Sequence, residues 1–185
     1  FRPGFKVDGR FLATGDGVSR AEAATRLGLD SNRFTLLIFG GSQGAHRLNQ
    51  AVMEALPMLA DERERIQFIH ATGPRDLSLV RQGYDALGCL AVVEPFFQAM
   101  AVAYATADFC FCRAGAGTVA ELCVLGKPSV LIPFPFAAND HQRHNAEALV
   151  ASGGARMVLD RDLSGATVAE IIRTFLHDRE VLDVM

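Results

Sequence analysis

The sequence has no cluster of lysine and arginine and no long hydrophobic run. Its 18 basic and 21 acidic residues are scattered along 185 positions and leave a formal net charge of -3. Charge distributed in this way offers no electrostatic footprint for nucleic acid or for an anionic membrane surface. No apolar run reaches the ~20 residues that a helix needs to span a bilayer. These absences favour one globular domain that binds no nucleic acid.

The chain also lacks the paired C-x-x-C knuckles of a zinc site. Its cysteines are Cys89, Cys110, Cys112 and Cys123. Three of them lie in apolar runs, where a free thiol behaves as a small hydrophobic group. Free thiols of this kind indicate a reducing compartment. Because Cys110 and Cys112 form only a C-x-C, we expect them to pack in the core and to bind no metal.

Short apolar runs alternate with segments of helical periodicity along most of the chain. The strand-like runs are 34–39, 66–70, 89–93, 109–112, 129–133 and 156–159, and the helix-like segments are 19–29, 48–59, 77–87, 98–105, 118–125, 140–151 and 168–176. This alternation predicts an α/β fold, with a Rossmann-like parallel sheet and helices on both faces. We interpret residues 1–33 as a linker arm with one short helix, and residues 34–185 as the domain.

Two glycine turns follow two of the expected strands. The first reads GGSQGA over residues 40–45, and the second reads RAGAGT over residues 113–118. A strand that stops at a glycine turn and feeds into a helix leaves N–H groups unpaired at the positive end of the helix dipole. Such a corner favours an anion. In a parallel sheet both turns lie at the carboxyl ends of strands, where ligands bind.

Spacing separates the common interpretations of the first turn. A P-loop ends in Gly-Lys-Ser or Gly-Lys-Thr, whereas residues 44–46 here are Gly-Ala-His. A dinucleotide fingerprint needs a carboxylate at the end of the second strand, but residues 70–73 are His-Ala-Thr-Gly. Neither nucleotide triphosphate hydrolysis nor NAD binding is therefore expected.

The same turn also spells G-x-S-x-G, the nucleophile elbow of serine hydrolases, with Ser42 as the nucleophile. Asp108 and either His141 or His144 follow in the order that such a triad requires. No glycine run of the oxyanion type precedes the turn, so the hydrolase is the weaker alternative. His141 and His144 lie three apart on one helix face, and without a third ligand they predict no metal site.

Taken together, the two turns suit a nucleotide that carries a sugar. Ser42 and the N–H groups that follow it would meet a diphosphate, while Ala116, Gly117 and Thr118 would approach the ligand closely. Glu121 lies one helical turn beyond Thr118, and its carboxylate can accept hydrogen bonds from both hydroxyls of a ribose. Thr118 and Glu121 also spell a T-x-x-E capping box, in which they would only close their own helix. The residues leave both interpretations open.

Three motifs, in the same order and with similar gaps, make the chain resemble the C-terminal half of the MurG family. They are GGSQGA followed by Leu48-Asn49, then AGAGTVAE over residues 114–121, and then Asp140-His141-Gln142 followed by Asn145-Ala146. The resemblance covers about residues 34–159. It implies a GT-B fold and an inverting transfer of N-acetylglucosamine from UDP-N-acetylglucosamine to a lipid-linked muramyl pentapeptide, without metal or cofactor. Another UDP-hexose glycolipid transferase, or a non-catalytic nucleotide-sugar-binding module, is the alternative.

The resemblance also implies roles for single residues. Ser42 would touch the diphosphate, the backbone of Phe97 would pair with uracil, and Glu121 would hold the ribose. The implied donor-site residues are Arg2, Gly41, Ser42, Gly44, Phe97, Ala116, Gly117, Thr118, Glu121, His141 and Gln142. Gly117 and Phe97 depart from the family pattern, which often has a larger apolar residue at the first position and Ile or Leu at the second. Arg2 resembles the arginine after the family's Gly-Asn-Pro, which this chain does not contain.

In the family the acceptor site, the membrane-docking surface and the proposed base belong to an N-terminal domain. Nothing before Phe34 is long enough to form one, and the chain begins at Phe1 without a methionine. We therefore expect a piece of a longer protein that binds the donor but does not transfer by itself. The resemblance implies a cytoplasmic protein, peripheral to the cytoplasmic face of a bacterial inner membrane. Phe134 and Phe136, without flanking basic residues, predict a pocket wall or a domain contact.

Overall fold

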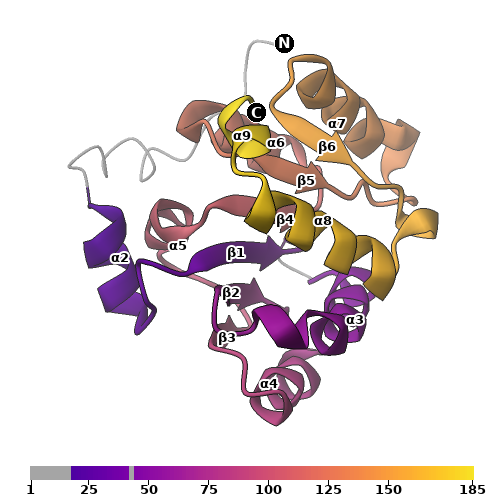
Figure 1. Cartoon of the computed structure of the whole chain (residues 1–185). Helices are drawn as coiled ribbons and strands as arrows, with labels where there is room; N and C mark the ends of the chain where they lie inside the picture. The colour runs from indigo at the N-terminus through magenta and orange to yellow at the C-terminus, as the bar shows by residue number, and fades with distance from the viewer. Residues whose placement is uncertain (1–17, 42–43) are drawn as a thin grey trace.

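A six-stranded parallel sheet organises residues 18–41 and 44–185, which are the residues that a computed structural model of the chain describes (Figure 1). The strands are β1 (Phe34–Phe39), β2 (Ile66–Ala71), β3 (Ala91–Glu94), β4 (Phe109–Cys112), β5 (Ser129–Leu131) and β6 (Ala155–Met157). Their order across the sheet is β3-β2-β1-β4-β5-β6, so the chain winds outward from β1 in one direction and from β4 in the other. The predicted α/β fold with a parallel Rossmann-like sheet is confirmed.

Helices cover both faces of this sheet (Figure 1). They are α2 (Arg20–Leu27), α3 (His46–Ala55), α4 (Leu77–Ala86), α5 (Met100–Thr106), α6 (Ala116–Leu125), α7 (His141–Ala151), α8 (Gly165–His177) and α9 (Glu180–Asp183), with short 3-10 helices at Leu56–Glu62, Ala138–Asp140 and Asp160–Asp162. One apolar cluster joins the sheet to α3, α4 and α8, and a second joins it to α2, α5, α6 and α7.

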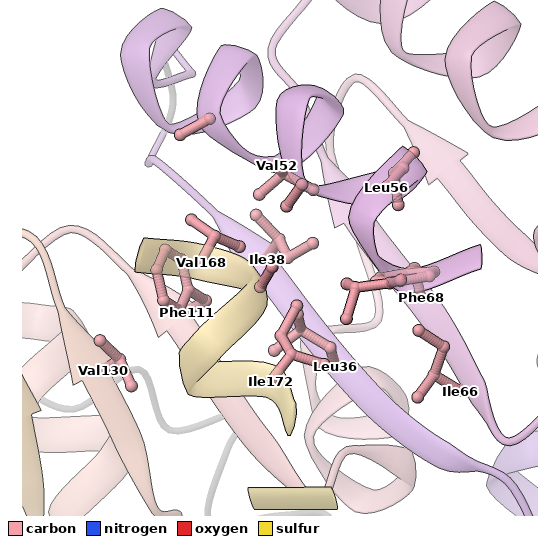
Figure 2. Close-up of a cluster of buried hydrophobic side chains, with 14 of the residues drawn as sticks. Leu36, Ile38, Val52, Leu56, Ile66, Phe68, Phe111, Val130, Val168 and Ile172 are labelled. Atoms are coloured by element: carbon pink, nitrogen blue, oxygen red, sulfur yellow. The ribbon is translucent and has the colours of Figure 1, made fainter. Parts of the chain in front are cut away.

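The central strand β1 divides its side chains between these two clusters. Leu36 and Ile38 belong to the cluster under α3 and α8, whereas Leu37 and Phe39 belong to the other. Figure 2 shows Val52 of α3 beside Ile38 in the first cluster. Every residue of β1 is buried, which confirms the expectation of a strand covered on both faces. Full burial of each such aliphatic side chain stabilises the fold by about 1.5–3 kcal/mol.

Several local signals act as the sequence indicates. Ser19 caps α2 in a reciprocal capping box with Glu22, and Gly28 closes the helix in a left-handed conformation. Pro57 ends α3, since the chain continues beyond Ala55 as a 3-10 helix. The expected helix 118–125 begins two residues earlier, at Ala116, and the short helix α9 was not expected.

Asp108 joins distant parts of the chain at the amino-terminal edge of the sheet. Its carboxylate accepts hydrogen bonds from Arg20 of α2 at 2.8 Å, from Arg179 at 2.7 Å and from the N–H of Thr35 at 2.7 Å. Asp108 directly precedes β4, whereas the GGSQGA turn follows the opposite, carboxyl end of β1. Asp108 is therefore a structural clamp, and it is not placed to serve Ser42 in a hydrolase triad.

Candidate functional site

The two glycine turns leave the carboxyl ends of neighbouring strands. β1 and β4 are paired in parallel, with Phe39 opposite Cys112 at their last residues. After β1 the chain enters α3 on one face of the sheet, and after β4 it enters α6 on the other. The strand order therefore reverses between β1 and β4, at a topological switch point. Doubly wound sheets bind their ligands in the crevice at such a point.

The first turn depends on its glycines. Gly44 has a φ of +73°, and a Cβ there would collide with the carbonyl oxygen of Thr72. The N–H of Gly44 donates to the carbonyl of Gly41 at 3.0 Å, which closes the turn. The N-cap of α3 is Ala45, which has no side chain able to close the first N–H groups of the helix. Ser42 and Gln43 lie outside the described residues.

A buried polar network supports the start of α3. The amide nitrogen of Asn49 donates to the carbonyl of Thr72 at 2.9 Å and to Asp76 at 2.8 Å. Its amide oxygen is 3.0 Å from Nε2 of His70, and Nδ1 of His70 is 3.1 Å from the hydroxyl of Tyr84. Because an amide oxygen only accepts, Nε2 carries the proton and Nδ1 accepts from the tyrosine. This network connects α3 with β2 and α4.

The charges in this network follow from burial. Burial lowers the pKa of His70 to about 3, and the nearby Asp76 opposes this shift only in part, so the imidazole is neutral. The pKa of Asp76 is also lowered, because hydrogen bonds from His46 and Asn49 outweigh the opposing effect of burial. His46, the first residue of α3, contacts Asp76 through Nδ1 at 2.9 Å. Asn49 had been singled out only as part of a motif, and no sequence signal indicated this network.

The second turn opens directly into α6. Gly115 is the N-cap and makes no side-chain hydrogen bond, so Ala116, Gly117 and Thr118 form the first turn of the helix. The N–H groups of a first turn have no partner within the helix. Thr118 is thus inside α6, and the structure does not form the capping box that Thr118 and Glu121 could have made. Of the two interpretations left open by the sequence, the one in which Glu121 only closes its own helix is therefore wrong.

Glu121 instead contacts a residue of the preceding helix. The hydroxyl of Tyr104, on α5, donates to a carboxylate oxygen of Glu121 at 3.1 Å. Burial raises the pKa of Tyr104, so the phenol keeps its proton. Glu121 itself is half-buried on α6. Glu121 follows the first turn of α6, whose N–H groups have no partner within the helix, by about one further helical turn along the chain.

Arg113 fixes the second turn against the loop after β5. It is buried, donates to the carbonyls of Ile132 and Pro133 at 3.2 and 3.3 Å, and forms an ion pair with Asp160 at 2.6 Å. Its guanidinium also lies 5.5 Å from the ring centre of Phe134. A buried arginine paired and hydrogen-bonded in this way holds its surroundings in one geometry.

The loop before α7 brings the third motif to the same edge of the sheet. The side-chain oxygen of Gln142 accepts from the N–H of Phe134 at 3.0 Å, and Nδ1 of His141 donates to the carbonyl of Ala138 at 2.6 Å. Asn139 and Asp140 both adopt left-handed conformations, with φ of +50° and +53°. Asp140 occupies the N-cap position of α7, but its side chain makes no capping hydrogen bond.

The remaining predicted residues have different placements. Phe97, between β3 and α5, packs against the apolar cluster that contains Tyr104. Phe136 is 84% exposed and contacts Phe134 edge to face. Arg2 lies outside the described residues. His144 contacts Glu147, and no group of three or more potential metal ligands occurs within residues 18–41 and 44–185.

These observations define a class of protein, namely a doubly wound α/β domain in which two helices begin without side-chain caps at the topological switch point. The chain belongs to the glycosyltransferase family 28 C-terminal domain family, whose sequence model matches residues 35–185. None of the helices in the described part of the chain is long and apolar enough to cross a membrane.

Two curated relatives of this chain carry the same protein name. A protein of Anaeromyxobacter sp. (strain K) is 55% identical over 145 residues, and one of Geotalea daltonii is 49% identical over 148 residues. Both are named UDP-N-acetylglucosamine--N-acetylmuramyl-(pentapeptide) pyrophosphoryl-undecaprenol N-acetylglucosamine transferase. The alignments cover 78% and 80% of this chain but only 38% and 40% of those relatives.

Solved structures agree with this assignment. The crystal structure of Acinetobacter baumannii MurG matches with a TM-score of 0.71 and 31% identity, over 82% of this chain and 45% of that one. The C-terminal CMP-Kdo binding domain of WaaA from the same species matches with a TM-score of 0.65 over 94% of this chain and 93% of that one. At 16% identity the second match shows the fold alone. The predicted resemblance to the C-terminal half of the MurG family is confirmed.

Proposed function

We propose that this chain is the donor-binding half of a glycosyltransferase that moves N-acetylglucosamine from UDP-N-acetylglucosamine to a lipid-linked muramyl pentapeptide in peptidoglycan synthesis. The observation that carries the proposal is the pair of helix starts, at Ala45 and Gly115, on neighbouring strand ends without side-chain caps. Each directs N–H groups and the positive end of a helix dipole toward an anion. The names of the curated relatives supply the donor and the acceptor.

In this proposal the two turns hold the two halves of the donor. Gly41, Ser42 and Gly44 bind the diphosphate, and Glu121 binds the ribose hydroxyls. Ala116, Gly117 and Thr118 line the sugar and the phosphates. The absence of a capping role for Glu121 supports its assignment, because its carboxylate is not needed to close α6.

The third motif and the loop after β3 complete the proposed donor site. Gln142 bonds to the sugar hydroxyls with His141 beside it, and both lie at the start of α7. The backbone of Phe97 pairs with uracil, while its side chain packs inward against the apolar cluster under α5. Arg2 is a further proposed contact.

The chemistry that these residues supply is stabilisation of a leaving group. As the bond between the sugar and the diphosphate breaks, negative charge develops on UDP. Preorganised backbone N–H groups and helix dipoles stabilise that charge without reorganisation and without a bound cation. We propose an inverting, metal-independent transfer in which the acceptor and the catalytic base come from a part of the protein outside these residues. The whole protein would act on its lipid-linked acceptor from the cytoplasmic face of the membrane, as a peripheral protein.

Calorimetric titration of this chain with UDP-N-acetylglucosamine, UDP-glucose and UDP tests the proposal. We expect UDP-N-acetylglucosamine to bind most tightly. Glu121→Ala removes the charged acceptor of the ribose hydroxyls, and we expect its affinity for UDP to fall by about 10–100-fold. Glu170→Ala is the matched control, since Glu170 is an exposed glutamate on α8, on the opposite face of the sheet from α6. If no nucleotide binds to folded wild-type chain, the proposal is wrong.

A further inference from the structure

The side chain of Tyr104 contacts one residue next to each of the two glycine turns. It is only 1% exposed, although it lies on α5 rather than on either turn. Its ring contacts that of Phe39 edge to face, with ring centres 5.9 Å apart, and Phe39 directly precedes the first turn. Its hydroxyl donates to Glu121 at 3.1 Å, on the helix that follows the second turn. One buried side chain therefore contacts both the strand that leads into the proposed diphosphate-binding turn and the proposed ribose-binding carboxylate.

The direction of this hydrogen bond follows from the chemistry of the two groups. Burial raises the pKa of Tyr104, so that the phenol is a donor at every physiological pH. An ionised carboxylate only accepts, and it offers about four lone-pair directions on two oxygens. The same carboxylate can therefore accept from the tyrosine and from the hydroxyls of a bound diol at once. The tyrosine restricts a long side chain that would otherwise lose its rotamer freedom when the ligand binds.

We propose that Tyr104 is a positioning residue that holds the Glu121 carboxylate toward the ribose, and that this contact sets a preference for ribonucleotides over 2′-deoxyribonucleotides. The inference rests on the proposed function, because it requires that Glu121 meets the ribose. Tyr104 acts only through Glu121 and does not touch the nucleotide. A tyrosine with a purely structural role would instead affect the stability of the fold and leave the preference for the sugar unchanged.

The test is calorimetric titration of UDP and 2′-deoxy-UDP into the wild-type chain and four variants. Tyr104→Phe removes one hydroxyl from α5. Tyr84→Phe is the matched control, since it removes another buried hydroxyl, which contacts His70 on the other face of the sheet. Glu121→Ala and the double variant Tyr104→Phe/Glu121→Ala complete a double-mutant cycle. Circular dichroism and thermal unfolding establish that each form is folded.

We expect wild type to prefer UDP over 2′-deoxy-UDP by about tenfold, the value of one charge-assisted hydrogen bond. Tyr104→Phe should lose most of this preference and bind UDP about 5–10-fold more weakly, while Tyr84→Phe keeps the wild-type preference. On the Glu121→Ala background, Tyr104→Phe should have no further effect on either ligand. If Tyr104→Phe does not fold, Glu121→Asp replaces it, because shortening the side chain withdraws the carboxylate from Tyr104 and should also abolish the preference.

The outcomes separate this inference from the proposed function. A Tyr104→Phe form that keeps the wild-type preference, while Glu121→Ala loses it, overturns the positioning role and leaves the proposed function standing. A further loss on the Glu121→Ala background also overturns the inference, because Tyr104 would then act independently of Glu121. Failure of wild type to bind UDP overturns both. Equal binding of the two nucleotides by wild type overturns the inference and removes the ribose from Glu121.

Discussion

Substituting the buried Asn49 with alanine should destabilise the chain more than the same substitution at any exposed or half-buried residue of α3. Asn49 is 1% exposed and makes three hydrogen bonds, to Thr72, Asp76 and His70. Alanine leaves the buried His70 N–H without its acceptor and deprives the Asp76 carboxylate of a donor. Each buried polar group left without a partner costs about 1–3 kcal/mol, so we expect the free energy of unfolding to fall by about 2–5 kcal/mol.

The assay is urea unfolding followed by circular dichroism, with Gln50→Ala as the matched control. Gln50 is the next residue of α3 and carries the same amide group, but it is half-buried and its side chain makes no hydrogen bond within residues 18–41 and 44–185. Its variant should stay within about 0.5 kcal/mol of wild type. The start of α3 also depends on Asn49 for its position against β2, so we expect Asn49→Ala to bind UDP about tenfold more weakly.

Asn49→Asp sharpens this prediction because it keeps the shape and changes only the chemistry. The donating nitrogen, 2.8 Å from Asp76, becomes a carboxylate oxygen beside another carboxylate. Like charges at this distance raise one of the two pKa values, so the variant should be least stable at neutral pH and should recover as a shared proton binds in acid. If Asn49→Ala and Gln50→Ala unfold at the same urea concentration, the network does not support α3 and the reasoning is refuted.

Two further predictions concern pH and activity. Burial lowers the pKa of His70 to about 3 from 6.5, so the unfolded chain binds a proton below pH 6.5 that the folded chain refuses until about pH 3. The free energy of unfolding should therefore fall on acidification through this window by up to ~1.4 kcal/mol per pH unit, and His70→Gln should flatten the slope; an unchanged slope would contradict a buried neutral imidazole. The 185-residue chain alone should bind UDP-N-acetylglucosamine yet fail to transfer the sugar to a lipid-linked acceptor, since it covers 38% of a curated relative; normal turnover would sink this expectation.

Sequence patterns predicted the elements whose causes are local. β1 has the predicted bounds, because its six residues, all apolar except Thr35, are covered on both faces of the sheet. α3 ends near Pro57 because proline cannot continue the helical hydrogen bonding. α6 began earlier than predicted, since the T-x-x-E signal pointed to a start at Thr118 that the glycine turn overrode. A capping pattern predicts only helices that begin with a side-chain cap. It cannot predict the start of a helix that has no such cap.

The side-chain contacts of the site could not be predicted in the same way. Asn49, His70 and Tyr84 are 21 and 14 residues apart in sequence, and they meet only because β2 lies beside β1 and α4 packs under α3. The contact between Tyr104 and Glu121 spans 17 residues and two helices. The periodicity of a sequence predicts helices and strands one at a time. It therefore does not predict which residues of different elements will contact each other.

The sequence by itself determined the α/β class, the two glycine turns and the family that they indicate, because each depends on residues adjacent in the chain. It left Glu121 between a helix cap and a ligand contact. The tertiary structure excluded the helix cap, because α6 starts at Ala116 and Glu121 accepts from Tyr104 instead of closing its own helix, whereas the ligand contact stays a proposal. The topology of the chain decides which strand ends are neighbours and which buried polar groups contact each other. These contacts join residues far apart in the sequence, so no local sequence pattern predicts them.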